Sequence, residues 1–200
     1  MTARPPRVAL SGSAGTGKTT LGRRLAERWG VPFVAEGMRT RLEAGLDLHT
    51  FSHDDLADLL HELFAEQEAA VAAALSAAGG FVADRSPIDH LAFWLYYGFG
   101  GLREAETAAV LDRTLAARSA CDAVVLLPWG VLPLEDDGVR SPNRWRQLHV
   151  QALVEGLSLR HVPADRLLWL PAGLTDPAAR VAWVEAELAG RTGVRVGRLA

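Results

Sequence analysis

The chain reads Gly12-Ser13-Ala14-Gly15-Thr16-Gly17-Lys18-Thr19 from residue 12 to residue 19, a full match to the pattern G-x-x-x-x-G-K-[ST]. In this pattern the glycines let the backbone wrap around phosphate oxygens, which meet N–H groups and the positive end of a helix dipole. Lys18 is the only lysine, and the other strongly basic residues are arginines. Because arginine is planar and bulky, we interpret Lys18 as a compact charge that reaches the β- and γ-phosphates of a nucleotide. The alternative is a glycine-rich turn before a helix.

The neighbouring residues favour the phosphate-binding interpretation, which requires a strand before the loop and a helix after it. Residues 7–11 form a short apolar run suited to a buried parallel strand, and residues 19–29 place apolar side chains on one helical face. We therefore predict a nucleotide-binding site, with the Thr19 hydroxyl on Mg²⁺ and Lys18 in a solvent-facing loop, and leave the choice between ATP and GTP open. The predicted nucleotide-binding residues are Gly12, Ser13, Ala14, Gly15, Thr16, Gly17, Lys18, Thr19 and Thr20.

Composition sets limits on the class of protein. The 200 residues, 49% of them hydrophobic, fit a single domain over residues 1–200. The net charge of -3 argues against a nucleic-acid partner. No apolar stretch reaches membrane-spanning length, and the first residues lack the apolar core of a signal peptide. We expect a cytoplasmic protein with no nucleic-acid or membrane partner, in which the lone Cys121 is structural, and these features are compatible with a homodimer.

Strand and helix patterns alternate along the chain. Apolar runs predict strands at residues 7–11, 31–35, 81–83, 123–127 and 166–170, and helical patterns cover residues 19–29, 52–77, 86–97, 103–118, 142–159 and 176–188. Ser52 and Ser86 are predicted N-caps, each followed three residues later by an aspartate. This alternation predicts an α/β fold with a parallel sheet and helices on both faces. Ligands then gather at the carboxyl ends of the strands.

Two of these strand ends carry acids, Glu36 and Asp84. Asp84 follows a hydrophobic run, where the second acid of a phosphate-loop site holds Mg²⁺ or a water on it. Glu36 is expected across the cleft, where a carboxylate can accept the proton of an attacking hydroxyl. For each acid the alternative is a helix N-cap or a solvated loop charge. Which of the two serves as the base is left open.

A lid and an acceptor pocket are the other predicted parts of the site. Residues 128–146 are rich in turn formers and acids and contain Arg140 and Arg144, which a closing lid would bring to the transferring phosphate. The alternative is an exposed helix start with solvated arginines. Asp89, Phe93 and Tyr97 share a helical face and could line an acceptor pocket, although such a stripe can equally be core. The six histidines form no tetrahedral zinc pattern.

Three short motifs behind the loop resemble those of the NadR-like ATPase and kinase family, whose relatives include ribosylnicotinamide kinase. They are Glu36-Gly37-Met38-Arg39, Asp84-Arg85-Ser86-Pro87-Ile88-Asp89 and Asp137-Gly138-Val139-Arg140. The Asp84-Arg85-Ser86 element is also similar to a motif of deoxyribonucleoside kinases, and the match extends from Val8 to about Leu170. The resemblance implies a P-loop kinase fold with five parallel strands and a mobile lid. It also implies that Arg39 and Arg85 face the substrate or the transferring phosphate.

Together these features predict an ATP- and Mg²⁺-dependent kinase that phosphorylates a hydroxyl of a small molecule, nucleoside-like or otherwise polar. The alternatives are a nucleotide-hydrolysing switch and a module that binds nucleotide only structurally. The chain has no glutamine placed to orient water after the third strand, which argues against the switch. The predicted catalytic residues are Lys18, Glu36, Asp84, Arg85, Arg140 and Arg144; the acceptor site comprises Glu36, Arg39, Arg85, Asp89, Phe93 and Tyr97; the metal ligands are Thr19 and Asp84.

Overall fold

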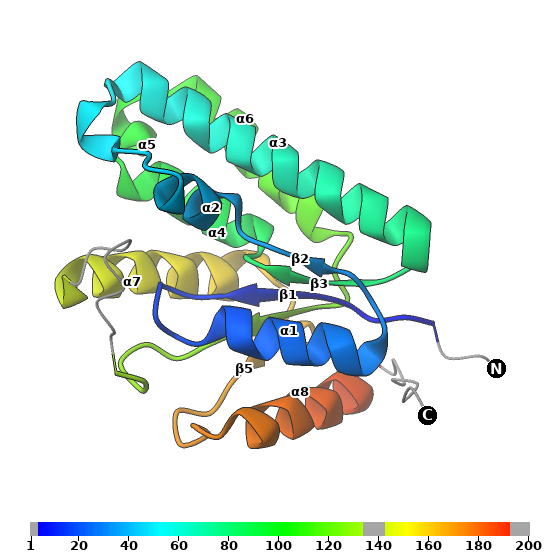
Figure 1. The fold of residues 1–200 in the computed structure, drawn as a ribbon. Helices are drawn as coiled ribbons and strands as arrows, with labels where there is room; N and C mark the ends of the chain where they lie inside the picture. Colours follow the sequence, from blue (N-terminus) through cyan, green and yellow to red (C-terminus); the bar gives the residue numbers. More distant parts are fainter. Residues whose placement is uncertain (1–3, 134–142, 193–200) are drawn as a thin grey trace.

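The predicted strands form one parallel sheet in the order β2-β3-β1-β4-β5 (Figure 1). The computed structural model of the chain describes residues 4–133 and 143–192. The strands are β1 (Arg7–Ser11), β2 (Phe33–Val34), β3 (Phe81–Asp84), β4 (Ala123–Leu126) and β5 (Leu167–Trp169). The predicted α/β P-loop fold is confirmed. The edge strand β2, which pairs only with β3, is shorter than predicted.

Helices cover both faces of this sheet. One face carries α1 (Lys18–Trp29) and α8 (Pro177–Thr192), and the other carries α3 (His53–Ala78), α4 (Pro87–Tyr96), α6 (Glu104–Arg118) and α7 (Arg144–His161) (Figure 1). Three short elements were not predicted: α2 (Gly37–Glu43), the 3₁₀ helix η1 (Leu48–Thr50) and α5 (Phe99–Leu102). With seven residues or fewer, none is long enough for a hydrophobic period to repeat.

The central strands are buried on both faces, as is usual for a parallel sheet. Alternate residues of β1 point to opposite sides, so that Val8 and Leu10 pack against α1 and α8 while Ala9 faces α3. Among the residues described, no helix is both long and apolar enough to cross a membrane. Cys121 is buried two residues before β4, and burial raises the pKa of its thiol to about 12. The thiol therefore stays protonated, which agrees with the predicted structural role.

The start of the chain packs closely against the segment that enters β3. Gly80 has no room for a side chain, because a Cβ atom there would lie 2.5 Å from the carbonyl oxygen of Pro6. That same carbonyl accepts the N–H of Phe81 at 3.0 Å. A glycine at residue 80 thus lets β1 and β3 pair in their observed register, in which Arg7 lies opposite Phe81.

We expect Gly80→Ala to lower the free energy of unfolding by about 1–3 kcal/mol, because the methyl group meets backbone atoms that cannot move away. Gly156→Ala is the matched control, since Gly156 lies within α7 and a Cβ atom there would meet no neighbouring segment within 4 Å. The control should raise stability by up to about 1 kcal/mol through helix propensity. Urea unfolding measures both variants. Equal stabilities of the two variants would contradict the packing argument.

Candidate functional site

The loop between β1 and α1 has the backbone of a phosphate-binding loop. Gly12, Gly15 and Gly17 have φ of 133°, 76° and 88°, values that other residues rarely adopt. Gly17 is also the N-cap of α1. The first N–H groups of that helix are left without intrahelical acceptors and can bind an anion. The loop therefore offers a preformed cradle for phosphate oxygens.

Lys18 lies inside this loop and is only 4% exposed, whereas we expected a solvent-facing side chain. Its ammonium group donates to the carbonyl oxygens of Gly12 at 2.9 Å and Ser13 at 2.7 Å. Burial, reinforced by the nearby Arg85, lowers the pKa of Lys18 to about 8, although neighbouring carboxylates oppose the shift. Both of these acceptors are neutral carbonyls, so a phosphate group in the loop would give this buried cation a negatively charged acceptor.

Thr19 and Asp84, the two predicted metal ligands, lie in contact. The Thr19 hydroxyl donates to Oδ2 of Asp84, which ends β3 and is 2% exposed. The other carboxylate oxygen, Oδ1, is buried and has no hydrogen-bond partner. A free carboxylate oxygen beside a hydroxyl fits Mg²⁺, which usually takes one or two carboxylates and completes its shell with phosphates and waters. No cluster of three or more His, Cys, Asp or Glu that could hold a metal occurs within the described ranges. Thr20 is exposed on α1.

Arg85 links the two halves of the site. Its guanidinium donates to Glu36 Oε1 from Nε at 2.8 Å, and to the carbonyl of Gly12 from Nη1 at 2.9 Å. The group lies 4.8 Å from the centre of the Phe93 ring. Burial opposes its charge, but the carboxylates of Glu36, Asp89 and Asp84 prevail and raise the pKa of Arg85. Its φ of 127° is strained for a non-glycine residue, and such strain clusters at functional sites.

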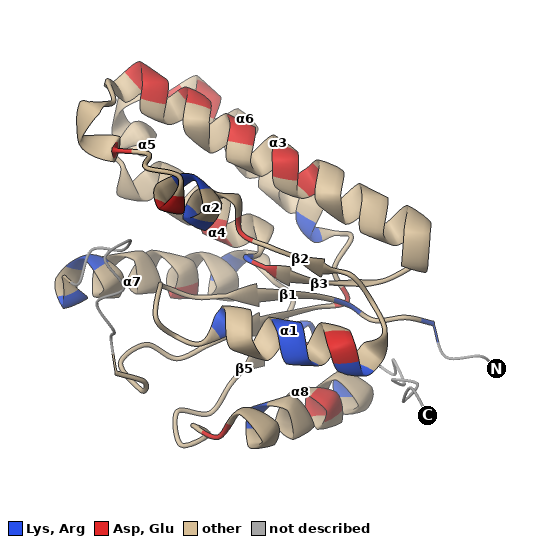
Figure 2. Cartoon of the chain, viewed as in Figure 1, with Lys and Arg blue, Asp and Glu red and all other residues tan. Residues whose placement is uncertain are grey.

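Glu36 and Arg39 lie at the start of α2. Glu36 occupies the N-cap position, yet no side-chain capping hydrogen bond forms there, and its carboxylate turns to Arg85 instead. This contact disfavours the capping alternative. Arg39 donates to Glu43 one turn along the same helix at 2.7 Å. Figure 2 shows charged residues at the first turn of α1, on α2 and at the start of α7, near the edge to which the strands point.

Asp89 lies inside the site rather than on its surface. The predicted capping box with Ser86 is present, but the carboxylate is fully buried. Oδ2 accepts from Ser11 Oγ at 2.6 Å and from the N–H and hydroxyl of Ser86, while Oδ1 accepts from Gly12 N–H at 3.2 Å and from Arg85. No oxygen remains for a ligand, so Asp89 is removed from the predicted acceptor pocket. The sequence showed the local cap and not the partners 77 and 78 residues away.

The two predicted aromatic residues have different surroundings. Phe93 is partly buried beneath the Arg85 guanidinium and so belongs to the site. Tyr97 caps the end of α4 and packs against the core around Trp94 and Phe99. Burial raises the pKa of the Tyr97 hydroxyl.

Two described parts of the predicted lid segment, residues 128–133 and 143–146, are in contact. Arg144 begins α7, and its guanidinium lies 5.7 Å from the Trp129 ring centre and 4.9 Å from that of Trp145. Asn143 caps the helix by accepting from Trp145 N–H, so α7 starts two residues later than predicted. Arg140 lies outside the described residues.

Two buried residues of other helices, which we did not predict, bind the backbone of the phosphate loop. Gln151 of α7 accepts the Ser13 N–H at 2.8 Å and donates to the carbonyl of Leu127 at 3.0 Å. Arg180 of α8 donates to the carbonyl of Thr16 at 2.9 Å. A polar stripe at helical spacing was the available signal for Gln151: the buried residues Gln147, Gln151, Val154 and Ser158 share one face of α7. Arg180 offered no such signal.

The low pKa of Lys18 makes the stability of the ligand-free protein depend on pH. The folded pKa of about 8 lies below the ordinary value of 10.5, so between these values the unfolded chain binds more protons and stability rises with pH. We expect the free energy of unfolding of the wild type, relative to Lys18→Met, to rise from pH 8 to 10 by at most about 1.4 kcal/mol per pH unit. Urea unfolding at several pH values measures it. Parallel pH profiles would contradict the burial of a charged ammonium.

Comparisons with known proteins agree with this geometry. A family model described as an AAA domain matches residues 7–162. No curated protein matches the chain. Among solved structures, NadR protein in complex with NR has a TM-score of 0.70 and 21% identity, with 98% of this chain and 52% of that chain covered. A second NadR structure holds NAD and AMP-PNP. The chain thus spans about half the length of the NadR chains that it matches.

Two kinases of similar length share the fold. Deoxyadenosine kinase from M. mycoides has a TM-score of 0.66 and 12% identity, with 92% of this chain and 99% of that chain covered. Another structure of that enzyme holds dATP. Thymidylate kinase from Ehrlichia chaffeensis has a TM-score of 0.56 and 16% identity, with 90% and 96% covered. At these identities the likeness establishes the fold alone. The predicted resemblance to NadR-like proteins is confirmed at that level, and, because the family model spans most of the chain, the protein belongs to the AAA domain family.

Proposed function

We propose that the protein is a phosphotransferase that uses ATP and Mg²⁺ to phosphorylate a hydroxyl group of a nucleoside-like or other polar metabolite. The observation that carries the proposal is the position of Arg85, whose guanidinium binds both the Glu36 carboxylate and the Gly12 carbonyl. The candidate base is therefore held next to the phosphate loop. The nucleotides named for the similar NadR and deoxyadenosine kinase structures support ATP as the donor.

ATP binding would use the groups that are already in place. The loop N–H groups and Lys18 bind the β- and γ-phosphates, for which the ammonium exchanges its carbonyl acceptors for phosphate oxygens. Thr19 and Asp84 would hold Mg²⁺, which offsets the charge of the phosphate oxygens. With Asp84 given to the metal, Glu36 is the better candidate for the base.

The transfer step follows from this division of roles. The acceptor hydroxyl oxygen attacks the γ-phosphorus, its proton passes to the Glu36 carboxylate, and the bond to the β–γ bridging oxygen breaks to release ADP. Arg85 fixes the position of the carboxylate and places positive charge beside the loop. No step requires a further reactant.

The acceptor would lie over Phe93 and between Glu36, Arg39 and Arg85. Residues 128–146 act as the lid in this proposal, within one domain over residues 1–200, and bring Arg140 and Arg144 to the transferring phosphate. The contact between Arg144 and Trp129 supports this assignment, because it joins the two described ends of the segment. Closure over a bound acceptor would exclude water and limit wasteful hydrolysis.

The proposal is tested by incubating the protein with Mg²⁺, ATP and a panel of nucleosides and polar alcohols while ADP release is followed. We expect slow release without an acceptor and a strong rise with the right one, because closure assembles the charge-stabilising groups. Fast release that no acceptor alters would instead favour the regulatory ATPase.

Replacing each of the two acids in turn by its amide separates their roles. Glu36→Gln should lower acceptor phosphorylation by about 10² to 10⁴ while ATP binding stays near normal. Asp84→Asn should instead weaken turnover together with its response to Mg²⁺. Glu27→Gln, an exposed glutamate on α1, is the control and should leave turnover unchanged. An unchanged transfer rate in Glu36→Gln would move the base to Asp84.

A further inference from the structure

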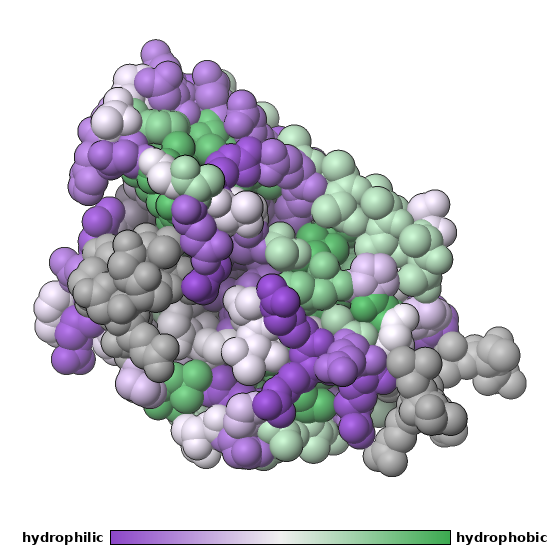
Figure 3. Space-filling view, in the orientation of Figure 1, coloured by the Kyte–Doolittle hydropathy of each residue, from purple (hydrophilic) through white to green (hydrophobic). Residues whose placement is uncertain are grey.

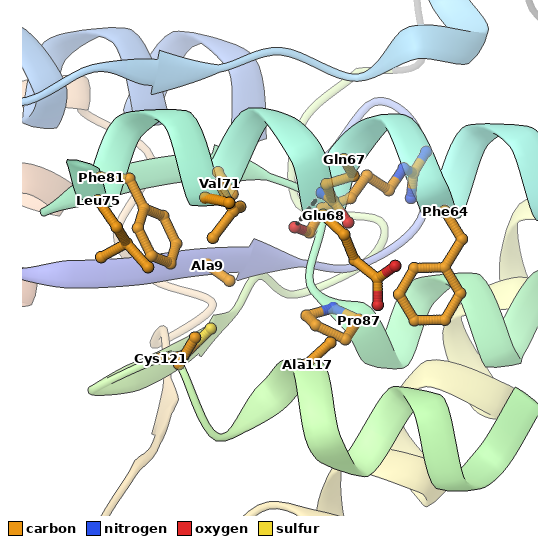
Figure 4. A pocket seen from close by; sticks show the side chains of 14 residues that line it. Ala9, Phe64, Gln67, Glu68, Val71, Leu75, Phe81, Pro87, Ala117 and Cys121 are labelled. Atoms are coloured by element: carbon orange, nitrogen blue, oxygen red, sulfur yellow. Dashed lines mark hydrogen bonds between the residues drawn. The ribbon is translucent and has the colours of Figure 1, made fainter. Parts of the chain in front are cut away.

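A cavity of about 240 Å³ lies on the far side of Arg85 from the phosphate loop, where α3 and α6 diverge over β1 and β3 (Figure 4). Among the described residues of the predicted nucleotide and acceptor sites, Arg85 is the one that lines it. Its walls are mainly apolar and include Ala9, Val71, Leu75, Phe81, Ala117 and Cys121.

Small side chains create this space. Ala72 of α3, Ala117 of α6 and Ala120 line the cavity and are too short to fill the gap between the two helices. The second half of α3 is rich in alanine, and pale apolar side chains cover it on the face seen in Figure 3. The cavity is partly open to solvent, so a small molecule can reach it from the surface. An apolar cavity of about 150 Å³ already binds benzene, and the larger volume here fits a bicyclic molecule such as indole.

The lining restricts the charge of an occupant. Glu68, at one end, forms an ion pair with Arg113 at 2.5 Å. Burial keeps the Cys121 thiol protonated by raising its pKa. The opposite end, around Leu75 and Phe81, is entirely apolar (Figure 4). Since the charged group at the rim already has its counterion, the cavity suits an uncharged molecule whose one polar group lies near Glu68.

Gln67 connects the cavity to the site. It lines the cavity and donates from Nε2 to the carbonyl of Arg85 at 2.8 Å (Figure 4). Its Oε1 lies 2.6 Å from Nε2 of His90. Arg85 itself lines the cavity, and its backbone is held at a φ of 127°. A molecule packed against Gln67 therefore touches the residue that holds a strained backbone in place.

We propose that this cavity binds a small, uncharged, mainly apolar molecule of about bicyclic size, and that Gln67 transmits its presence to Arg85. Binding is independent of the proposed phosphotransfer. An effect of the bound molecule on catalysis, in contrast, rests on the proposed phosphotransfer, in which Arg85 positions the Glu36 carboxylate.

Indole is the probe for binding, read as the rise in melting temperature with indole concentration. The wild type should show a saturable rise that Ala117→Leu abolishes, because the larger side chain fills the cavity. Ala116→Leu, an exposed neighbour on the same helix, should behave as the wild type. In the wild type, backbone NMR shifts should centre on Ala9, Val71 and Cys121. The proposal is overturned if indole does not raise the melting temperature of the wild type, or raises that of Ala117→Leu equally. It is also overturned if the NMR shifts centre elsewhere, or if a dimer covers α3 and α6 and excludes indole.

Transmission is read from the Arg85 Nε–H resonance, which reports the hydrogen bond to Glu36 without any turnover. Indole should shift this resonance in the wild type and not in Gln67→Leu. A resonance that indole leaves unmoved in the wild type, or that shifts equally in Gln67→Leu, overturns the role of Gln67. Because neither readout uses ATP, failure of this inference is distinguishable from failure of the proposed kinase activity.

Discussion

The carboxylate of Asp89 joins two segments that are distant in sequence, the end of β1 with the loop that follows it and the turn that begins α4. It accepts hydrogen bonds from Ser11 at the end of β1, from Gly12 in the loop, and from the turn that contains Arg85 and Ser86. A fully buried carboxylate is stable only when donors and an opposite charge compensate it. The first strand, the loop and α4 are therefore held as one unit, and removing Asp89 would leave the Arg85 guanidinium with Glu36 as its remaining ion-pair partner.

This arrangement prepares the site before any ligand arrives. Lys18 and Arg85 both donate to the carbonyl of Gly12, so two cations are held beside the loop in the absence of phosphate. In the proposed reaction, Lys18 would turn to a phosphate oxygen while Arg85 keeps its hydrogen bonds to this carbonyl and to Glu36. Gln151 and Arg180 fix the loop from the outside. Preorganised charge of this kind is the form of stabilisation on which phosphoryl transfer mainly depends.

Local signals in the sequence predicted much of this structure. The loop, the first strand, the position of Asp84 and the capping boxes at Ser52 and Ser86 all depend on residues within a few positions of one another. The unpredicted features depend on contacts between distant residues. Gln151 and Arg180 reach the loop across 138 and 164 positions. The burial of Lys18 depends on packing around the loop, which the sequence motif does not specify. The helix α2 is too short to show a hydrophobic period.

The destination of the γ-phosphoryl group tests the central claim most directly. ³¹P NMR can follow ATP in the presence of Mg²⁺ and an acceptor that stimulates turnover. Phosphotransfer to the acceptor predicts a new phosphate-ester signal that grows in step with ADP, with little inorganic phosphate. Inorganic phosphate as the sole product, formed at the same rate with and without acceptor, would contradict it.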